Sequence, residues 1–120
     1  MERMDTLWPG GPVFFYDDGL FKPGTDAFLL GAFARPKARD VVCDLGAGTG
    51  LIGLLLLARE PSLTLHNVEL QAAALRLAER TAQANGLAVS QHLADLRHLE
   101  GVLPAGSMDY VVSNAPYFPP

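Results

Sequence analysis

A glycine-rich segment between an apolar run and a helical pattern is the feature that most limits what this sequence can fold into. Residues 41–44 (Val-Val-Cys-Asp) are apolar and β-branched, which is typical of a strand buried on both faces of a sheet. The segment Asp44-Leu45-Gly46-Ala47-Gly48-Thr49-Gly50 follows, and residues 51–59 then predict a helix that Pro61 ends. Glycines at such a junction let the backbone turn tightly and approach a ligand closely. We therefore expect a ligand-binding loop at the C-terminal end of this strand.

The rest of the chain alternates apolar runs with helical patterns. Further strands are predicted at residues 63–69, 89–94 and 109–113, and helices at 25–34 and 71–85, with Gly86 closing the second helix in a left-handed conformation. Strands separated by helical crossovers form a parallel sheet with right-handed connections. The pattern therefore predicts an α/β fold.

The N-terminal segment has weaker signals. Residues 13–16 and 20–22 flank Asp17-Asp18-Gly19, which predicts a short hairpin whose turn needs a positive φ at Gly19. Thr25 is expected to cap the helix that follows. Residues 1–11 lack periodicity and end in Pro-Gly-Gly, so we expect a flexible lead-in, with residues 12–120 forming one domain.

The composition sets limits on function. The chain has 120 residues, of which 49% are apolar and 18% charged, as in a soluble globular domain. A secretory signal is not recognisable, and the longest apolar stretch is far shorter than the roughly 18 residues of a membrane span. Cys43 is the only cysteine, so we expect a cytoplasmic protein without membrane association. The net charge of −4 argues weakly against a dedicated nucleic-acid binder, but it leaves room for a small basic patch.

Two classes of ligand compete for the glycine loop. Gly48, Gly50 and Gly53 have the spacing of a dinucleotide-binding fingerprint, and Glu69 lies at about the right separation to bind a ribose. Asp44 argues against this class, because its carboxylate would face a doubly charged pyrophosphate. S-adenosylmethionine carries a cationic ammonium and a sulfonium, which a carboxylate attracts. The electrostatics therefore favour the methyl donor over a nicotinamide cofactor.

The polar residues at the predicted strand ends resemble the ordered motifs of Rossmann-like methyltransferases. These motifs are the loop after Asp44, Glu69 after the second strand, Asp95 after the third, and Asn114-Ala115-Pro116-Tyr117 after the fourth. An Asn-Pro-Pro-Tyr type of motif marks the branch that methylates exocyclic or amide nitrogens. Residues 18–21 and 25–30 are further similar to bacterial tRNA adenine-N6 methyltransferases that act near a valine-tRNA anticodon. The resemblance covers about residues 13–120.

This resemblance implies a Rossmann-like methyltransferase fold, with strand order 3-2-1-4, flanking helices, and the last strands lacking. It implies S-adenosylmethionine as cofactor and an RNA substrate, with tRNA favoured. The implied catalytic positions are Asn114, Ala115, Pro116 and Tyr117. The implied cofactor-binding positions are Lys22, Thr25, Asp44, Gly46, Ala47, Gly48, Gly50, Glu69, Leu70, Asp95, Leu96 and Asn114.

The final motif suits transfer to an amine whose lone pair is delocalised. An Asn114 side-chain oxygen and the Ala115 carbonyl can accept the two N–H hydrogens, and the Tyr117 ring can stack on a base. The family's usual first proline is Ala115 here, so the backbone restraint that proline gives is absent. A protein glutamine amide or a guanine amine in ribosomal RNA remains an alternative substrate, and so does a cofactor-binding fragment without turnover.

The histidines and the cysteine are not expected to take part in catalysis or metal binding. His66, His92 and His98 lack the spacing of metal ligands, and Cys43 is expected in the core. The fourth strand is apolar on both faces, so we expect its outer edge to be covered by missing C-terminal strands or by a second chain.

Overall fold

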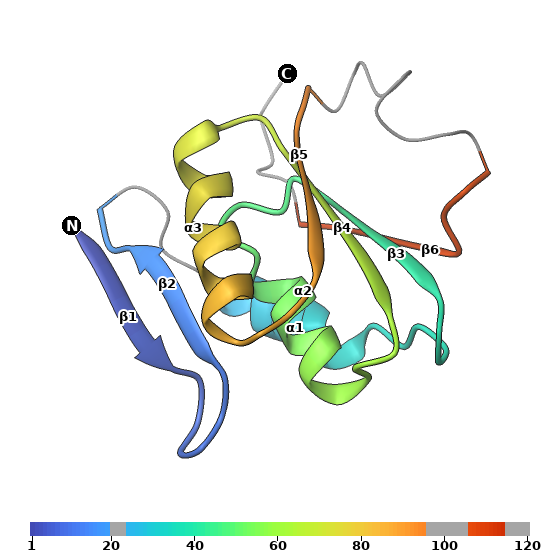
Figure 1. Ribbon diagram of the computed structural model, residues 1–120, viewed down its shortest axis with the longest axis horizontal. Coiled ribbons are helices and arrows are strands. Elements are labelled where there is room, and N and C mark those ends of the chain that lie inside the picture. The colour runs from blue at the N-terminus through green and yellow to red at the C-terminus, as the bar shows by residue number, and fades with distance from the viewer. Residues whose placement is uncertain (20–23, 96–105, 115–120) are drawn as a thin grey trace.

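The computed structural model describes residues 1–19, 24–95 and 106–114, and its centre is a four-stranded parallel sheet (Figure 1). The strands are β3 (Val41–Leu45), β4 (Thr64–Glu69), β5 (Val89–Leu93) and β6 (Tyr110–Ser113), in the order β5-β4-β3-β6. This order confirms the predicted arrangement 3-2-1-4. The helices are α1 (Thr25–Phe33), α2 (Leu51–Arg59) and α3 (Ala72–Ala84).

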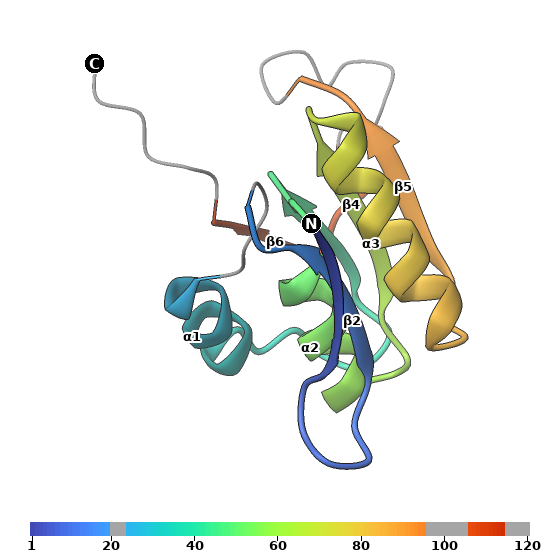
Figure 2. The same cartoon turned by 90° about the vertical axis from the view of Figure 1, so that its left-hand side faces the viewer.

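The three helices lie on one face of the sheet (Figures 1 and 2). The connections through α2 and α3 move the chain in the same direction across the sheet, from β3 to β4 and on to β5, so both cover the same face. The core lies in this layer, where Val42 and Leu65 meet the helix residues Leu54 and Leu56. A Cβ on Gly53 would lie 2.3 Å from Leu65 Cδ2, so the missing side chain lets α2 lie close to β4.

The strand β3 and the helix α2 form where the sequence predicts them. Val42, Cys43 and Asp44 are all buried, as expected for a strand at the centre of a sheet. Burial also raises the pKa of the Cys43 thiol to about 11, which agrees with a core role for this residue. Gly86 has a φ of +66° and follows the end of α3, as predicted for a left-handed cap.

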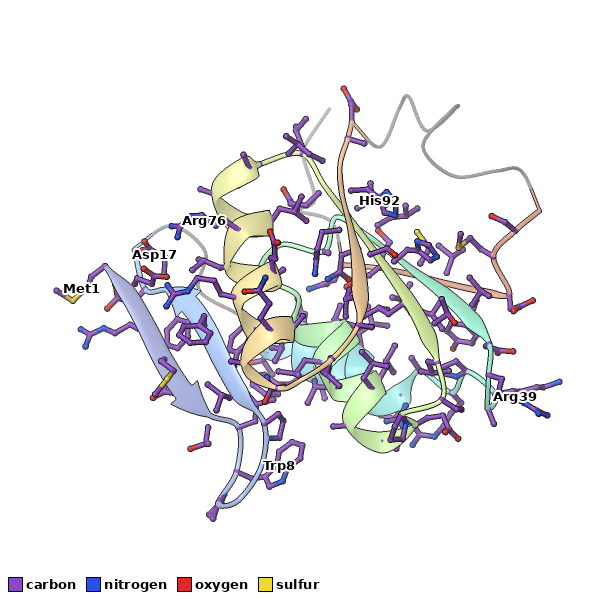
Figure 3. All side chains as sticks on the ribbon, in the orientation of Figure 1. Met1, Trp8, Asp17, Arg39, Arg76 and His92 are labelled. Carbon is purple, nitrogen blue, oxygen red and sulfur yellow. The ribbon has the colours of Figure 1, made fainter. Side chains whose placement is uncertain are left out.

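The N-terminal hairpin differs from the prediction. Glu2–Thr6 forms the strand β1, which pairs antiparallel with β2 (Val13–Asp17), so the prediction of a flexible lead-in over residues 1–11 is wrong for this strand. The turn lies around Pro9-Gly10, where Gly10 has a φ of +76°, and Trp8 lies at this end of the hairpin (Figure 3). All five residues of β1 are exposed, so no alternation of apolar residues marks this strand in the sequence.

Two smaller predictions about this region are also wrong. The φ of Gly19 is outside the left-handed region. The hairpin partner of β2 is β1, which precedes it, so the turn of the hairpin is not at Asp17-Asp18-Gly19. Thr25 is the first residue of α1 and makes no capping hydrogen bond, since Gly24 occupies the capping position. The predicted strand at 20–22 lies outside the described residues.

The hairpin is attached to α3 and not to the main sheet. Asn85 accepts a hydrogen bond from the Val13 N–H (2.8 Å) and donates to the Val13 carbonyl (2.6 Å). Thr81 Oγ1 accepts from the Phe15 N–H (3.0 Å). The guanidinium of Arg80 lies 4.4 Å from the centre of the Phe15 ring. Side chains in the last turn and at the C-cap of α3 therefore form hydrogen bonds with backbone groups on the edge of β2 that does not pair with β1.

Among the described residues, no helix is both long and apolar enough to cross a membrane.

The variant Asn85→Ala should weaken the attachment of the hairpin to α3. It leaves the half-buried N–H and carbonyl of Val13 without partners, so we expect a loss of about 1–2 kcal/mol in the free energy of unfolding. Urea denaturation measures the loss, and hydrogen exchange at the Val13 amide should accelerate. Gln83→Ala on the exposed side of α3 is the matched control. An equal effect of both variants would contradict the attachment.

Candidate functional site

The predicted functional residues gather at one edge of the sheet. The four strands are parallel, so their C-terminal ends meet at the same edge. Asp44 and the glycine loop stand at the end of β3, Glu69 at the end of β4, Asp95 just beyond β5, and Asn114 just beyond β6. Residues that are far apart in the sequence are thereby brought to one place.

The glycine loop depends on left-handed backbone conformations. Gly46, Gly48 and Gly50 have φ values of +74°, +58° and +86°, which side chains disfavour. A Cβ on Gly50 would also lie 3.0 Å from the Ala78 Cβ, so this residue lets α2 and α3 approach each other. The spacing of three alternate glycines is therefore required by the backbone itself.

Backbone hydrogen bonds connect the loop to β4. The N–H groups of Gly46 and Ala47 both donate to the Val68 carbonyl, at 2.8 and 3.0 Å, and the Gly50 N–H donates to the Ala47 carbonyl. The Gly48 N–H donates to Glu69 Oε1 at 2.9 Å. The loop is thus held in place before any ligand arrives.

Glu69 is fixed by two backbone donors. Its second oxygen accepts from the Gln71 N–H at 2.8 Å, at the start of α3. An ionised carboxylate has about four acceptor positions, so each oxygen keeps one further position for a ligand hydroxyl. The side chain is buried but lies at the strand end, beside the loop. This is the geometry of a rigid acceptor for a diol.

Asp44 is the least satisfied group of the site. Its side chain is fully buried, and within the described part of the chain neither carboxylate oxygen has a hydrogen-bond partner. Burial, and then the charge of Glu69, raise the pKa of Asp44 to about 7. A buried carboxylate without a donor is costly, and a bound cation would remove that cost.

These contacts disfavour the dinucleotide alternative. A pyrophosphate binds to N–H groups of the glycine turn, but the N–H groups of Gly48 and Gly50 already donate within the protein. Gly53, the third glycine of the fingerprint, packs against Leu65. The site presents the carboxylates of Asp44 and Glu69, so its chemistry fits a ligand with a positive charge and ribose hydroxyls.

The remaining predicted residues have different positions. Asn114 and Thr25 are exposed, and Leu70 is exposed at the start of the turn after β4. Asp95 is half-buried and already has an interaction partner. Lys22, Leu96, Ala115, Pro116 and Tyr117 lie outside the described residues.

Sequence reasoning missed two polar residues in register with Asp44, the buried Asn67 and the half-buried Gln91. Asn67 on β4 is the register neighbour of Asp44, and Gln91 on β5 is the register neighbour of Asn67. Register neighbours in a sheet share a face. A local signal existed, since Asn67 interrupts an apolar strand pattern, but its neighbours follow only from the register.

The two described histidines lie on the other face of the sheet. His66 Nδ1 and His92 Nε2 are 3.0 Å apart, and Figure 3 shows His92 on the side of β5 away from α3. Burial, and then His92, lower the pKa of His66. The ring centres are 5.2 Å apart, so the two nitrogens point at each other in a hydrogen bond and do not converge on a third point. Among the described residues, no group of three or more potential ligands could hold a metal.

The variant Asp44→Asn should stabilise the ligand-free chain at alkaline pH. The folded-state pKa of about 7 lies above the ordinary value of 3.8, so the stability that protonated Asp44 contributes is full below about pH 4 and is lost as the pH rises through 7. We expect the variant to exceed the wild type at pH 8, with the advantage shrinking by up to ~1.4 kcal/mol per pH unit below pH 7. Urea denaturation at several pH values measures this. Asp26→Asn, at an exposed position, is the control, and a pH-independent loss in Asp44→Asn would contradict the assignment.

Comparisons with known proteins identify the family of the chain. The chain matches the family model described as methyltransferase small domain over residues 14–119. It is 38% identical over 113 residues to the tRNA1(Val) (adenine(37)-N6)-methyltransferase of Serratia proteamaculans, covering 88% of this chain and 41% of that protein. The enzyme of the same name from Pasteurella multocida is 39% identical over 100 residues, covering 82% and 42%.

A solved structure has the same fold. The 16S rRNA N2 methyltransferase of Thermus thermophilus, in complex with AdoMet and guanosine, superposes with a TM-score of 0.76 at 20% identity, covering 98% of this chain and 33% of that one. This chain spans 41% and 42% of the length of the two curated relatives. The match over residues 14–119, together with the strand order and the glycine loop, shows that the chain belongs to the methyltransferase small domain family.

Proposed function

We propose that this chain is the cofactor-binding part of an S-adenosylmethionine-dependent N-methyltransferase that methylates adenine N6 in tRNA. The observation that carries the proposal is the buried Asp44 carboxylate, which accepts no hydrogen bond from the described residues and stands at the end of β3 beside a preformed glycine loop. The names of the two curated relatives support the reaction and the tRNA substrate. A cytoplasmic location agrees with a tRNA substrate and with the single, buried cysteine.

The residues around the loop have distinct roles in this proposal. Asp44 attracts the cationic end of the donor, and the positive-φ glycines Gly46, Gly48 and Gly50 leave room for its close approach. Glu69 accepts from the ribose hydroxyls with the positions that Gly48 and Gln71 leave open. Asp95 accepts from an exocyclic amine of the donor. The remaining proposed contacts are those of Lys22, Thr25, Ala47, Leu70, Leu96 and Asn114.

S-adenosylmethionine, when bound, supplies an electrophilic methyl group on a sulfonium. The protein's task is then to direct the amine of the base toward that methyl group. Asn114 Oδ1 and the Ala115 carbonyl accept the two N–H hydrogens, which favours a pyramidal nitrogen with an available lone pair. Tyr117 stacks on the base, and Pro116 stiffens the segment between them. These groups act by alignment and electrostatics, so a strong general base is not required.

The exposed edge of β6 belongs to the proposal as well. Val111 is 54% exposed on this strand, and in the described sheet β6 pairs with β3 on one side only. We expect further strands of a longer chain, or a second chain, to cover this edge, since bare apolar edges promote aggregation.

The direct test combines binding with methyl transfer. Calorimetry should show that the chain binds S-adenosylmethionine and does not bind NADH. With a labelled methyl donor, tRNA should be methylated, while ribosomal RNA and a release-factor protein should not. Asn114→Ala should lower the transfer rate by about 100-fold, and Ser90→Ala on the exposed face of β5 should leave it unchanged.

Each failure identifies a different error. Methylation of ribosomal RNA or of protein, but not of tRNA, would show that the substrate is misassigned. Donor binding without transfer to any substrate would identify a cofactor-binding fragment without turnover, as the change to Ala115 also allows. Binding of NADH in place of the methyl donor would overturn the whole proposal.

A further inference from the structure

A row of polar side chains, two buried and one half-buried, crosses the sheet beside the donor site. Asp44 on β3, Asn67 on β4 and Gln91 on β5 are successive register neighbours, so they share the face that α2 and α3 cover. Asn67 is 2% exposed. Neighbouring strands are about 4.8 Å apart, so adjacent side chains in this row are within reach of one another. Three polar side chains in a buried row need partners, because each unpaired group is costly.

Within the described residues the row has one internal hydrogen bond, and each of its three side chains has at least one atom without a partner. Asn67 Nδ2 donates to Gln91 Oε1 at 3.2 Å. Both Asp44 oxygens, Asn67 Oδ1 and Gln91 Nε2 have no partner in the described part of the chain. The two ends of an amide diverge from its central carbon, and Nδ2 is directed to β5, so Oδ1 is directed away from β5 and toward the β3 side. Strand β4 lies between β5 and β3, so Asp44 lies on that side.

Rotating both amides by 180° pairs most of these atoms. The nitrogen and oxygen of an amide occupy almost the same space, so the rotation moves no other group. Gln91 Nε2 then donates to Asn67 Oδ1, and Asn67 Nδ2 is turned toward Asp44. One carboxylate oxygen is left for the ligand. In the present orientation the row instead suits a protonated Asp44, whose O–H can donate to Asn67 Oδ1.

We propose that Asn67, oriented by Gln91, is a positioning residue that donates a hydrogen bond to ionised Asp44 and so holds its carboxylate ready for the cationic end of the ligand. The row has two hydrogen-bond directions, one for protonated and one for ionised Asp44, and the two amides rotate together between them. The identity of the ligand rests on the proposed function, whereas the row itself does not.

Few other groups act on Asp44. Among the described residues, Glu69 on β4 and the adjacent Cys43 thiol are the titratable groups that interact with it, and the first turns of α2 and α3 contain no acidic residue. Removing the Asn67 donor should therefore act on the ionisation of Asp44 alone. A hydrogen bond to an ionised group corresponds to about one pKa unit or more.

The test measures Asp44 directly in the ligand-free chain. The carboxyl carbon of Asp44, labelled with ¹³C and assigned by its absence in Asp44→Asn, is titrated by NMR. Asn67→Leu should raise the pKa of Asp44 by about one unit, and Gln91→Leu should raise it by less. Leu65→Val, on the same strand and face, is the control for altered packing and should not change the titration. The affinity for S-adenosylmethionine should fall about tenfold at pH 6 in Asn67→Leu, through the lower ionised fraction of Asp44, and by less at pH 9, where only the positioning of the carboxylate is lost.

The outcomes separate this inference from the proposed function. An unchanged or lowered pKa of Asp44 in both leucine variants would overturn the positioning role even if the donor binds. A raised pKa of Asp44 in the leucine variants of a chain that does not bind the donor would support the positioning role of Asn67 and reject the proposed function. The small cavity of about 10 Å³ beside Asn67 could admit one water that satisfies Oδ1 in its present orientation. Amide protons of Asn67 that at pH 9 lie near Gln91 and not near Asp44 would show that arrangement, and would also overturn the inference.

Discussion

The carboxylate of Asp44 is buried, accepts no hydrogen bond from a backbone group in the described part of the chain, and determines the organisation of the site. A loop that wraps a strand end could direct its N–H groups at the carboxylate. Here the N–H groups of Gly46 and Ala47 donate instead to the Val68 carbonyl. The loop therefore stays rigid while the negative charge beside it stays uncompensated. A cationic ligand supplies a positive charge beside Asp44, so the burial that destabilises the ionised carboxylate in the ligand-free chain favours binding of the ligand.

The parallel topology makes this arrangement possible. Glu69 reaches the loop because β4 lies beside β3 with its C-terminal end at the same edge, and its carboxylate joins the Gly48 N–H to the start of α3. The helices α2 and α3 cover one face, and Gly50 lets them approach each other at the loop. Distant segments thus contribute to one site, whose predominant charge is negative. That charge suits a positively charged donor, and it disfavours a pyrophosphate.

Local patterns predicted the parts of the fold that local forces determine. The β-branched run predicted β3, the glycines and Pro61 predicted the bounds of α2, and the strand order followed from the family resemblance. The strand β1 was missed because its residues are all exposed and it is stabilised by pairing with β2, which no alternation reveals. Asn67 and Gln91 were missed for a related reason. Their importance arises from the register between strands, and a single strand does not encode its register with a neighbour.

The proton balance of donor binding tests the central claim most directly. If a cationic ligand binds beside ionised Asp44, it must lower the pKa of that carboxyl from about 7, so binding at pH 6.5 must release a proton from a large fraction of the molecules. Calorimetry of S-adenosylmethionine binding in buffers of different ionisation enthalpy measures this number. We expect proton release at pH 6.5 in the wild type and none in Asp44→Asn. Binding of the donor at pH 6.5 with no proton release, or with proton uptake, would contradict the account.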